Sequence, residues 1–329
     1  MLYYAEYLCA HSMNIRKITA AMLAAFTVSA ALPAAYIIEP GVRSYAEEYE
    51  EPITYFDGTL SYTVYSDHVE LTDCEDSAES VDIPSEYDGL PITIIKYAFQ
   101  DCTSLTSVTI PDSVTEIGDS AFRRCSALTE ITIPDNITKI GEQAFAECTA
   151  LKEIVIPESV TEIGEIAFSE CKAITEITIP DGTPKIDRFL LNDCTSLTSV
   201  TIPDSVEEIG EGAFSGCTSL ADITIPKGVT HIDGVAFRDT PWLEKQREID
   251  PLVVVNNILV DGRTCEGAIE IPDGVTQISG LSFEGSTAVT SVKMPVGLTE
   301  IGYGAFYECT ALKTADFPDG LDRKSTRLN

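Results

Sequence analysis

Residues 121–143 read AFRRCSALTEITIPDNITKIGEQ, and this stretch decides the fold because its neighbours repeat it at a fixed spacing. The preceding residues 98–120 read AFQDCTSLTSVTIPDSVTEIGDS, and residues 144–166 read AFAECTALKEIVIPESVTEIGEI. Three sequences this similar at a period of 23 residues are typical of a solenoid, in which each unit forms one turn and stacks on the next.

The last part of the apolar segment in each unit has the pattern of a short strand. In the unit that starts at residue 98, Leu105, Val108 and Ile110 are separated by polar residues, and Pro111 ends the run. Alternating apolar positions rich in β-branched residues favour a strand with its apolar side chains on one face. One unit cannot bury that face alone, so the pattern predicts parallel strands stacked over many turns.

Two further columns of residues recur once per turn. Phenylalanine repeats at one position, where Leu191 replaces it once, and we expect these rings to stack inside the solenoid. The ring column consists of Phe99, Phe122, Phe145, Phe168, Phe214, Phe237, Phe283 and Phe306. A glycine column, which we predict to supply a positive φ at a corner, consists of Gly118, Gly141, Gly164, Gly210 and Gly302, with Asp187, Asp233, Asn256 and Ser279 at equivalent positions.

The chain begins with the anatomy of a secretory signal at residues 13–46. Arg16 and Lys17 precede an apolar run that ends at Ile38, and the small residues Ser44 and Ala46 suit cleavage after Ala46. The pattern predicts export, to the cell surface or beyond it. An uncleaved membrane anchor is the alternative, although the apolar run is short for a membrane span.

Both ends of the chain depart from the pattern. Residues 1–12 precede the basic region of the signal, and we interpret Met13 as the more natural start. Residues 322–329 read DRKSTRLN, which resembles the translation of a sequencing adapter rather than a repeat. We expect the natural protein to continue past Leu321.

Between these ends the sequence divides into four parts. They are a cap with a degenerate repeat at 47–97, six regular repeats at 98–235, an irregular repeat with a protruding insertion at 236–258, and further repeats at 259–321.

The unit AFxxCxxLxxIxIPxxVxxIGxx closely resembles the BspA-like class of leucine-rich repeats found on bacterial surface and secreted proteins. The resemblance covers residues 55–321 and implies a mainly β, right-handed leucine-rich-repeat solenoid of about ten turns. Residues 55–69 are similar to the family's N-terminal hairpin cap, and residues 240–262 look like its recurrent interruption, a short helix followed by an apolar ribbon. The family implies adhesion or host-component binding, although a fold alone does not establish a function.

The composition and the remaining motifs give no sign of catalysis. A formal charge of −32 argues against binding nucleic acid or an anionic membrane, so a charged partner should be basic or cation-bridged. Seven cysteines form one inward column, Cys102, Cys125, Cys148, Cys171, Cys194, Cys217 and Cys309, and their parallel side chains favour buried free thiols. Cys74 and Cys265 lie outside the column and could pair with each other, but nothing in the sequence indicates that they do. No motif predicts a metal site, a cofactor or a catalytic residue.

The exposed side of the strands is the predicted binding surface, because alternate residues between the inward ones must face solvent. Its residues are Glu130, Thr132, Glu153, Val155, Glu176, Thr178, Thr201, Asp222 and Thr224, and a second candidate is the protrusion with Trp242, Lys245 and Arg247. We expect an extracellular protein or glycan ligand and no membrane insertion of the repeats. Threonine also simply favours exposed strand positions. The alternatives are the targeting portion of a larger secreted enzyme and a structural cell-envelope spacer.

Overall fold

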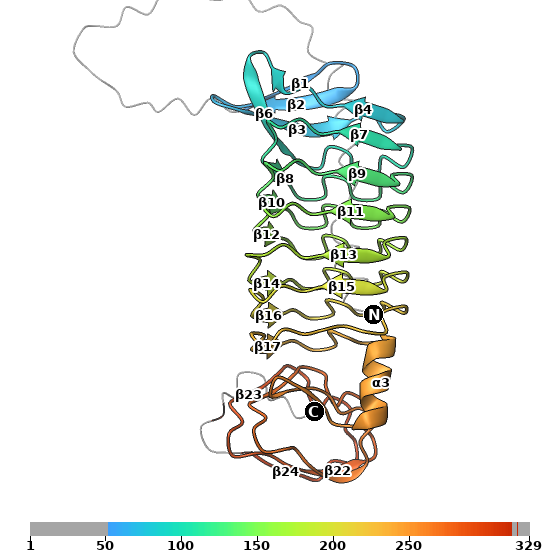
Figure 1. Ribbon diagram of the computed structural model, residues 1–329, viewed down its shortest axis with the longest axis vertical. Coiled ribbons are helices and arrows are strands. Elements are labelled where there is room, and N and C mark those ends of the chain that lie inside the picture. Colours follow the sequence, from blue (N-terminus) through green and yellow to red (C-terminus); the bar gives the residue numbers. More distant parts are fainter. Residues whose placement is uncertain (1–51, 318–320, 322–329) are drawn as a thin grey trace, which may run out of the picture. The chain divides into compact units, whose positions relative to one another are not determined.

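Each regular repeat carries two short strands, and the equivalent strands of successive repeats stack in parallel register (Figure 1). The computed structural model describes residues 52–317 and residue 321. These residues form a parallel-strand solenoid of about 11 turns of about 23 residues, which confirms the predicted fold class. The expected export signal at 13–46, the segment at 1–12 and the tail at 322–329 lie outside the described residues. In the part that is described, no helix is long and apolar enough to cross a membrane.

Two-residue strands form one row, here called the short-strand row. It consists of β8 (Glu116–Ile117), β10 (Lys139–Ile140), β12 (Glu162–Ile163), β14 (Lys185–Ile186), β16 (Glu208–Ile209) and β17 (His231–Ile232). The isoleucine of each pair is buried and the residue before it is more exposed. The buried isoleucine of each strand directly precedes the glycine column, as Ile117 precedes Gly118.

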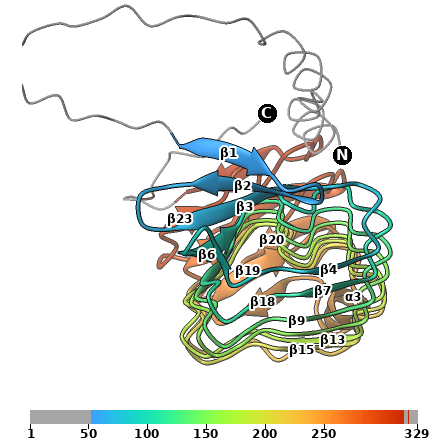
Figure 2. The same ribbon diagram turned by 90° about the horizontal axis from the view of Figure 1, so that it is seen from above.

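Three-residue strands form the other row, here called the long-strand row. It consists of β4 (Ser80–Asp82), β7 (Ser107–Thr109), β9 (Glu130–Thr132), β11 (Glu153–Val155), β13 (Glu176–Thr178) and β15 (Ser199–Thr201). From β9 to β15 the middle residue is buried and the outer two are exposed, as the alternating pattern predicts. Figure 2, which looks along the stack, shows the turns of this row lying one behind another.

An antiparallel hairpin covers the first turn, as the resemblance implies. The cap contains β1 (Ile53–Phe56), β2 (Leu60–Val64) and β3 (Val69–Cys74), and β3 then pairs in parallel with β6 (Leu90–Ile95), which also pairs with β5 (Glu86–Tyr87). Tyr62 is buried on β2, stacks on Tyr87 at 4.3 Å and donates a hydrogen bond to Asp57. The cap thus continues the short-strand row and covers the apolar end that the first repeat would otherwise expose.

The interruption consists of a helix and a hairpin. Helix α3 (Pro241–Ile249) starts at Thr240, whose hydroxyl accepts a hydrogen bond from the Leu243 amide, and proline occupies its first turn. Strands β18 (Val253–Val255) and β19 (Ile258–Asp261) follow as an antiparallel ribbon. The rows then resume with β20 (Gly267–Glu270), β21 (Gln277–Ile278), β22 (Val289–Lys293), β23 (Glu300–Ile301) and β24 (Thr314–Asp316). The helix and ribbon match the interruption expected from the family resemblance.

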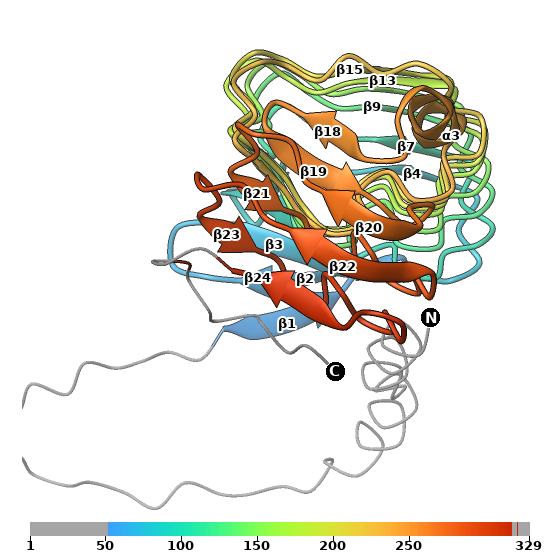
Figure 3. The same cartoon turned by 90° about the horizontal axis from the view of Figure 1, so that it is seen from below.

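Strand β19 separates two apolar cores. Ile258 and Val260 belong to the core of the earlier turns, while Leu259 belongs to the core of the later ones. Successive side chains of a strand point to opposite faces, so one strand lines both cores. Figure 3 shows β20, β22 and β24 lying side by side beyond it.

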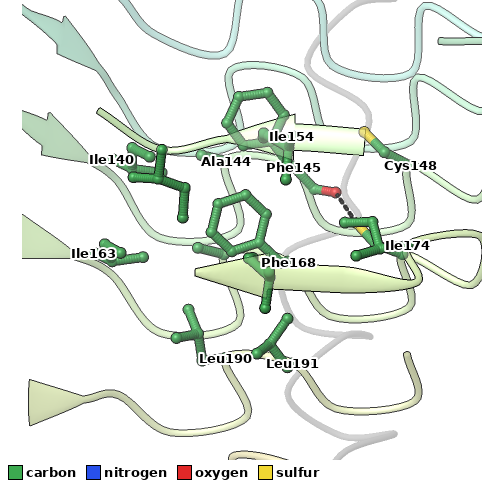
Figure 4. Packing of buried hydrophobic residues seen from close by; sticks show 14 of the residues in the cluster. Ile140, Ala144, Phe145, Cys148, Ile154, Ile163, Phe168, Ile174, Leu190 and Leu191 are labelled. Atoms are coloured by element: carbon green, nitrogen blue, oxygen red, sulfur yellow. Dashed lines mark hydrogen bonds between the residues drawn. The ribbon is translucent and has the colours of Figure 1, made fainter. Parts of the chain in front are cut away.

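The phenylalanine column is a buried stack of rings, as predicted. Phe99, Phe122, Phe145 and Phe168 are fully buried, and neighbouring ring centroids lie 5.0, 5.3 and 5.5 Å apart with nearly parallel planes. Figure 4 shows Phe145 and Phe168 in this stack. Leu191 interrupts the stack, which resumes at Phe214 and Phe237 and again at Phe283 and Phe306. Ring pairs at this separation stabilise the fold beyond the effect of the apolar area that they bury. The column is therefore a main source of stability between turns.

Each regular thiol of the cysteine column is buried and hydrogen-bonded to the turn before it. The sulfur of Cys125 donates to the carbonyl of Phe99 at 3.1 Å, and Cys148, Cys171, Cys194, Cys217 and Cys309 repeat this bond. Figure 4 marks one such bond by a dashed line. All nine cysteines of the described chain are buried and reduced, in line with the expectation of thiols that act as packing.

Burial of these thiols predicts that the fold loses stability at alkaline pH. Removal from water raises the pKa of Cys148 from 9.0 to about 12, so the folded chain keeps a proton that the unfolded chain releases. The thiol's contribution is complete below pH 9 and is lost as the pH rises towards 12, at about 1.4 kcal/mol per pH unit. Urea unfolding in the presence of reductant, at about pH 8 and about pH 10, measures this loss. The variant Cys148→Ser should show a shallower pH dependence, and an unchanged slope would contradict the assignment.

The glycine column has a different cause from the one predicted. None of Gly118, Gly141, Gly164, Gly210 and Gly302 has a positive φ. A β-carbon on Gly141 would instead lie 2.6 Å from the backbone nitrogen of Asp119 in the preceding turn. The prediction of a left-handed corner at this column is therefore wrong, and the glycines allow close approach of neighbouring backbones. Positive φ falls two positions later, at Ser120, Gln143, Ile166, Phe189, Gly212, Val235, Leu281 and Gly304, while Asn256 alone of the aspartate and asparagine replacements has it.

Candidate binding surface

Two columns of exposed side chains run along the long-strand row. Strands β9 and β11 place Glu130 beside Glu153 and Thr132 beside Val155, and β13 and β15 place Thr178 beside Thr201. The sheet exposes these outer residues because the middle residue of each strand is buried in the core. We call this surface, from β9 to β15, the strand strip. Its neighbours lie about one strand spacing apart, roughly 4.8 Å.

The strand strip combines hydroxyl groups, carboxylates and one exposed apolar side chain. Val155 is 79% exposed within the column that otherwise carries threonines. Seven of the residues predicted for the binding surface are exposed: Glu130, Thr132, Glu153, Val155, Glu176, Thr178 and Thr201.

The sixth repeat does not extend the strip as a strand. Asp222 and Thr224 are exposed at the expected positions, but residues 221–226 form no strand. Helix α3 takes the place of the next strand, because the Trp242 amide donates to the Leu220 carbonyl at 3.0 Å and Lys245 donates to the Ala221 carbonyl at 3.1 Å. The prediction of a strand at Asp222 and Thr224 is wrong, and the strand of the following turn, which would pair with them on one side, is replaced by α3.

Lys245 connects the two predicted binding elements. Its ammonium group lies 3.3 Å from Asp222, whose side chain is 91% exposed. In Figure 1, α3 lies on the same side of the solenoid as β15. The exposed side of α3 therefore borders the end of the strip, and the two candidates form one continuous surface rather than two separate sites.

Trp242 is not a protruding recognition residue. Only 8% of the residue is exposed, and its ring packs on Phe237 with centroids 4.6 Å apart. The prediction that Trp242 projects from the surface is wrong, since the helix is amphipathic and its apolar side closes the ring stack of the preceding repeats.

Arg247 is likewise part of the scaffold. Its side chain is 14% exposed and makes two 2.9 Å hydrogen bonds to Asp261, which is buried at the end of β19. Arg263 donates a further hydrogen bond to Asp261 at 2.7 Å. The bidentate geometry holds α3 against the ribbon, so the prediction that Arg247 contacts a ligand is not supported by its position. Of the three protrusion residues only Lys245 remains available at the surface.

The two rows differ in how their charges are paired. On the short-strand row Lys139 lies 3.0 Å from Glu116, and Lys185 lies 3.8 Å from Glu208. On the strand strip Glu130, Glu153 and Glu176 form a ladder of like charges, and within residues 52–317 no cation forms an ion pair with them. Like charges side by side in a sheet are unfavourable, so the row of glutamates does not stabilise the fold.

The repeats after the interruption present a surface that the sequence analysis overlooked. Glu270, Lys293 and Asp316 continue the threonine column in parallel register, and Lys293 pairs with Glu270. The motif Ile269-Glu270-Ile271-Pro272 repeats that of the earlier strands, so the period alone could have located this column. Charged side chains that pair with each other replace the hydroxyl groups here.

A small, shallow depression lies where α3 and the ribbon meet the earlier repeats. Asp233, Arg238, Asp261 and Arg263 are among its lining residues. Burial raises the pKa of Asp233 above its usual value. Arg238 pairs with Glu284 and Arg263 with Asp261, so these charges join the earlier repeats to the later ones. In the described residues no group of three or more histidine, cysteine or acidic side chains could hold a metal ion.

Comparison with known families and structures agrees with this geometry. The family model described as the BspA-type leucine-rich repeat region matches residues 72–195, 144–250 and 264–327, in six copies. The chain belongs to the BspA-type leucine-rich-repeat family. The resemblance inferred from the repeat motif is thereby confirmed.

The chain is similar to solved structures of bacterial leucine-rich-repeat proteins, two of which match most of it. A leucine-rich cell surface protein from Faecalibacterium prausnitzii is 34% identical, with a TM-score of 0.58, and the match covers 83% of this chain and 78% of that one. A leucine-rich-repeat protein from Bacteroides ovatus is 29% identical, with a TM-score of 0.59, and the match covers 82% and 77%. A search of the curated proteins found no match.

Proposed function

We propose that this BspA-type protein is an exported, non-catalytic binding protein that displays the strand strip to an extracellular protein or glycan. The observation that carries the proposal is the strip itself, a row of exposed side chains held in register on rigid strands. The similar structure from Faecalibacterium prausnitzii is described as that of a cell surface protein, which supports display outside the cell. Leucine-rich repeats provide extended surfaces for binding through repeated columns of this kind.

The chemistry of the strip narrows the kind of ligand. Three adjacent carboxylates, Glu130, Glu153 and Glu176, repel each other, and a ligand with basic groups would relieve that repulsion. The threonine hydroxyl groups beside them both donate and accept hydrogen bonds. The overall charge of −32 favours the same partner, because it attracts basic surfaces and repels acidic ones. We therefore propose a ligand with basic and hydrogen-bonding groups.

A binding experiment with paired variants tests the proposal. The chain is immobilised on beads and challenged with extracellular-matrix and cell-surface preparations. We expect saturable binding that weakens as salt is added, because the carboxylates on the strip are exposed. The variant Glu176→Lys should weaken binding at least about tenfold. The control Glu162→Lys places the same charge change on the short-strand row, and it should leave binding unchanged.

Three results would count against the strand strip. Absence of saturable binding would contradict the proposed function. Equal losses from Glu176→Lys and Glu162→Lys would mean that only net charge matters. A loss on Lys245→Glu without a loss on Glu176→Lys would move the site to the exposed side of α3.

A further inference from the structure

Strand β1 is the outermost strand of the N-terminal cap. In the sheet that runs from the cap into the short-strand row, β1 pairs with β2 on one side, and residues 52–317 place no strand on its other side. Figure 2 shows β1 at the outer edge of the cap, next to β2. An unpaired strand edge presents backbone donors and acceptors that another strand can use.

The hairpin turn shows which backbone groups face this open edge. The Asp57 amide donates to the Leu60 carbonyl at 3.1 Å, and hydrogen-bonded pairs alternate with non-bonded pairs along an antiparallel ladder. The register of β1 on β2 has no shift, so Tyr55 belongs to a hydrogen-bonded pair with β2. Thr54 and Phe56 belong to non-bonded pairs and therefore direct their N–H and C=O groups to the open edge.

Apolar side chains line the open edge on both faces of β1. Ile53, Tyr55 and Phe56 are 58%, 45% and 63% exposed. Tyr55 lies opposite Tyr62, which is buried, so Ile53 and Tyr55 extend the apolar face of the cap to its edge. Phe56 lies on the other face. A strand added beyond β1 would contact side chains on both faces.

Strand β1 has few of the features that protect an exposed edge from pairing. Natural edge strands commonly carry a bulge, a proline or a charged side chain. The four residues of β1 read ITYF, and they pair with β2 without a bulge. Pro52 precedes the strand and leaves the outward amides of Thr54 and Phe56 in place. The geometry of β1 is therefore that of a strand able to pair with another chain.

The charge around β1 indicates the kind of partner. Lys96 is the only lysine or arginine in residues 52–97, which contain many acidic residues, among them the exposed Asp57, Asp67 and Glu75. The sequence EEYEE at 47–51 leads directly into β1. Pairing β1 with the β1 of a second copy would bring two acidic caps together, and like charges repel. A basic partner would be attracted instead.

We propose that β1 binds an extended segment of a basic protein as an additional antiparallel strand. The backbone of that segment bonds to Thr54 and Phe56, and its alternate apolar side chains pack on Ile53 and Tyr55. In an antiparallel pair the C-terminal end of the added strand meets the N-terminal end of β1. Lysine or arginine residues that follow the added strand then lie near the acidic sequence before β1. This edge is a second interaction surface, and it does not depend on the function proposed for the strand strip.

Titration of the full chain with a defined peptide tests the proposal. The probe is the fluorescently labelled synthetic peptide TVTVTVKKK, and its anisotropy reports binding. We expect saturable binding that weakens with added salt, because the acidic side chains around β1 are exposed. The matched peptide TVTVTVEEE should bind at least about tenfold more weakly.

Two substitutions at Thr54 separate the backbone from the side chain. Thr54→Pro removes an amide that faces the open edge and no bond to β2, so the hairpin should persist while peptide binding weakens at least about tenfold. Thr54→Val keeps the amide and loses only the hydroxyl contact with Thr63 at 3.3 Å, so it should bind the peptide as the wild-type chain does. Circular dichroism and thermal melting check that both variants fold.

Amide exchange in the wild-type chain provides a reading that needs no variant. With saturating TVTVTVKKK, nuclear magnetic resonance should show the amides of Thr54 and Phe56 exchanging at least about tenfold more slowly. The Tyr55 amide, which is directed to β2, should change little. Protection of alternate residues is the pattern that an added strand produces, whereas a peptide bound through side chains alone would not produce it.

Several results would overturn the proposal. They are no binding of TVTVTVKKK, equal losses from Thr54→Pro and Thr54→Val, and no protection of Thr54 and Phe56. A loss on Glu176→Lys but not on Thr54→Pro would place the peptide on the strand strip. A dimer in sedimentation that Thr54→Pro abolishes would assign the edge to a second copy. We expect Glu176→Lys to bind the peptide unchanged, so failure at β1 leaves the strand strip to its own experiment.

Discussion

Replacing Phe145 with alanine should lower the free energy of unfolding by about 3–5 kcal/mol. Phe145 is fully buried and stacks on Phe122 at 5.3 Å and on Phe168 at 5.5 Å. Removing the ring leaves a cavity between turns that strands and glycine contacts hold at a fixed spacing, so the space cannot close easily. Urea unfolding followed by circular dichroism measures the change.

The chain provides a matched control for this substitution. Leu191 occupies the same column naturally and is fully buried. Phe145→Leu should therefore cost only about 1 kcal/mol, because leucine fills most of the space without distorting the turn. A loss below about 1 kcal/mol for Phe145→Ala would show that the ring column does not hold the turns together.

Replacing Asp261 with alanine should be comparably damaging, at about 3–5 kcal/mol. The carboxylate is 3% exposed and accepts hydrogen bonds from both Arg247 and Arg263. Without it two guanidinium groups remain in a largely buried position with no carboxylate between them, and an uncompensated buried charge is costly. Thermal unfolding of the variant measures the loss, which should concentrate in the later repeats next to β19.

Glu244 supplies the comparison for Asp261. It pairs with the same Arg247 at 2.5 Å, but its side chain is 59% exposed. Glu244→Ala should therefore cost less than about 1 kcal/mol. If the two variants destabilise the protein equally, burial of the carboxylate is not the source of its effect.

Repetition explains why so much of the fold could be predicted. Positions such as Phe145 and Cys148 recur in nearly every turn. Because many equivalent positions carry the same residue type, burial of that position can be inferred even though single turns differ. The strand at residues 153–155 follows from alternation in the same way. The repeat motif does not show whether its glycine is needed for a positive φ or for close approach of a neighbouring backbone. Only the spacing of neighbouring turns shows that Gly141 must admit the backbone of Asp119.

The predicted site was least accurate where repetition fails. Trp242, Arg247 and Asp222 all belong to the interruption or border it, and no neighbouring unit defines their surroundings. The polar residues around Trp242 in the sequence predict an exposed side chain. Trp242 is buried because it packs on Phe237, the last ring of its stack, which would otherwise be exposed. The pairing of Arg247 with Asp261 depends on a ribbon that folds back after the helix, a contact that periodicity cannot express.

Strand β19 marks the boundary between two apolar cores. Because Ile258 and Leu259 belong to different apolar cores, polar contacts such as the Arg238–Glu284 pair and the bond from Ser279 to the Ile232 carbonyl hold the later turns to the earlier ones. We therefore expect heat, or a pulling force applied at the far end, to melt the smaller core of the later turns first. The long-strand row from β9 to β15 would stay folded while the end of the protein is lost, which protects the surface from damage beyond it.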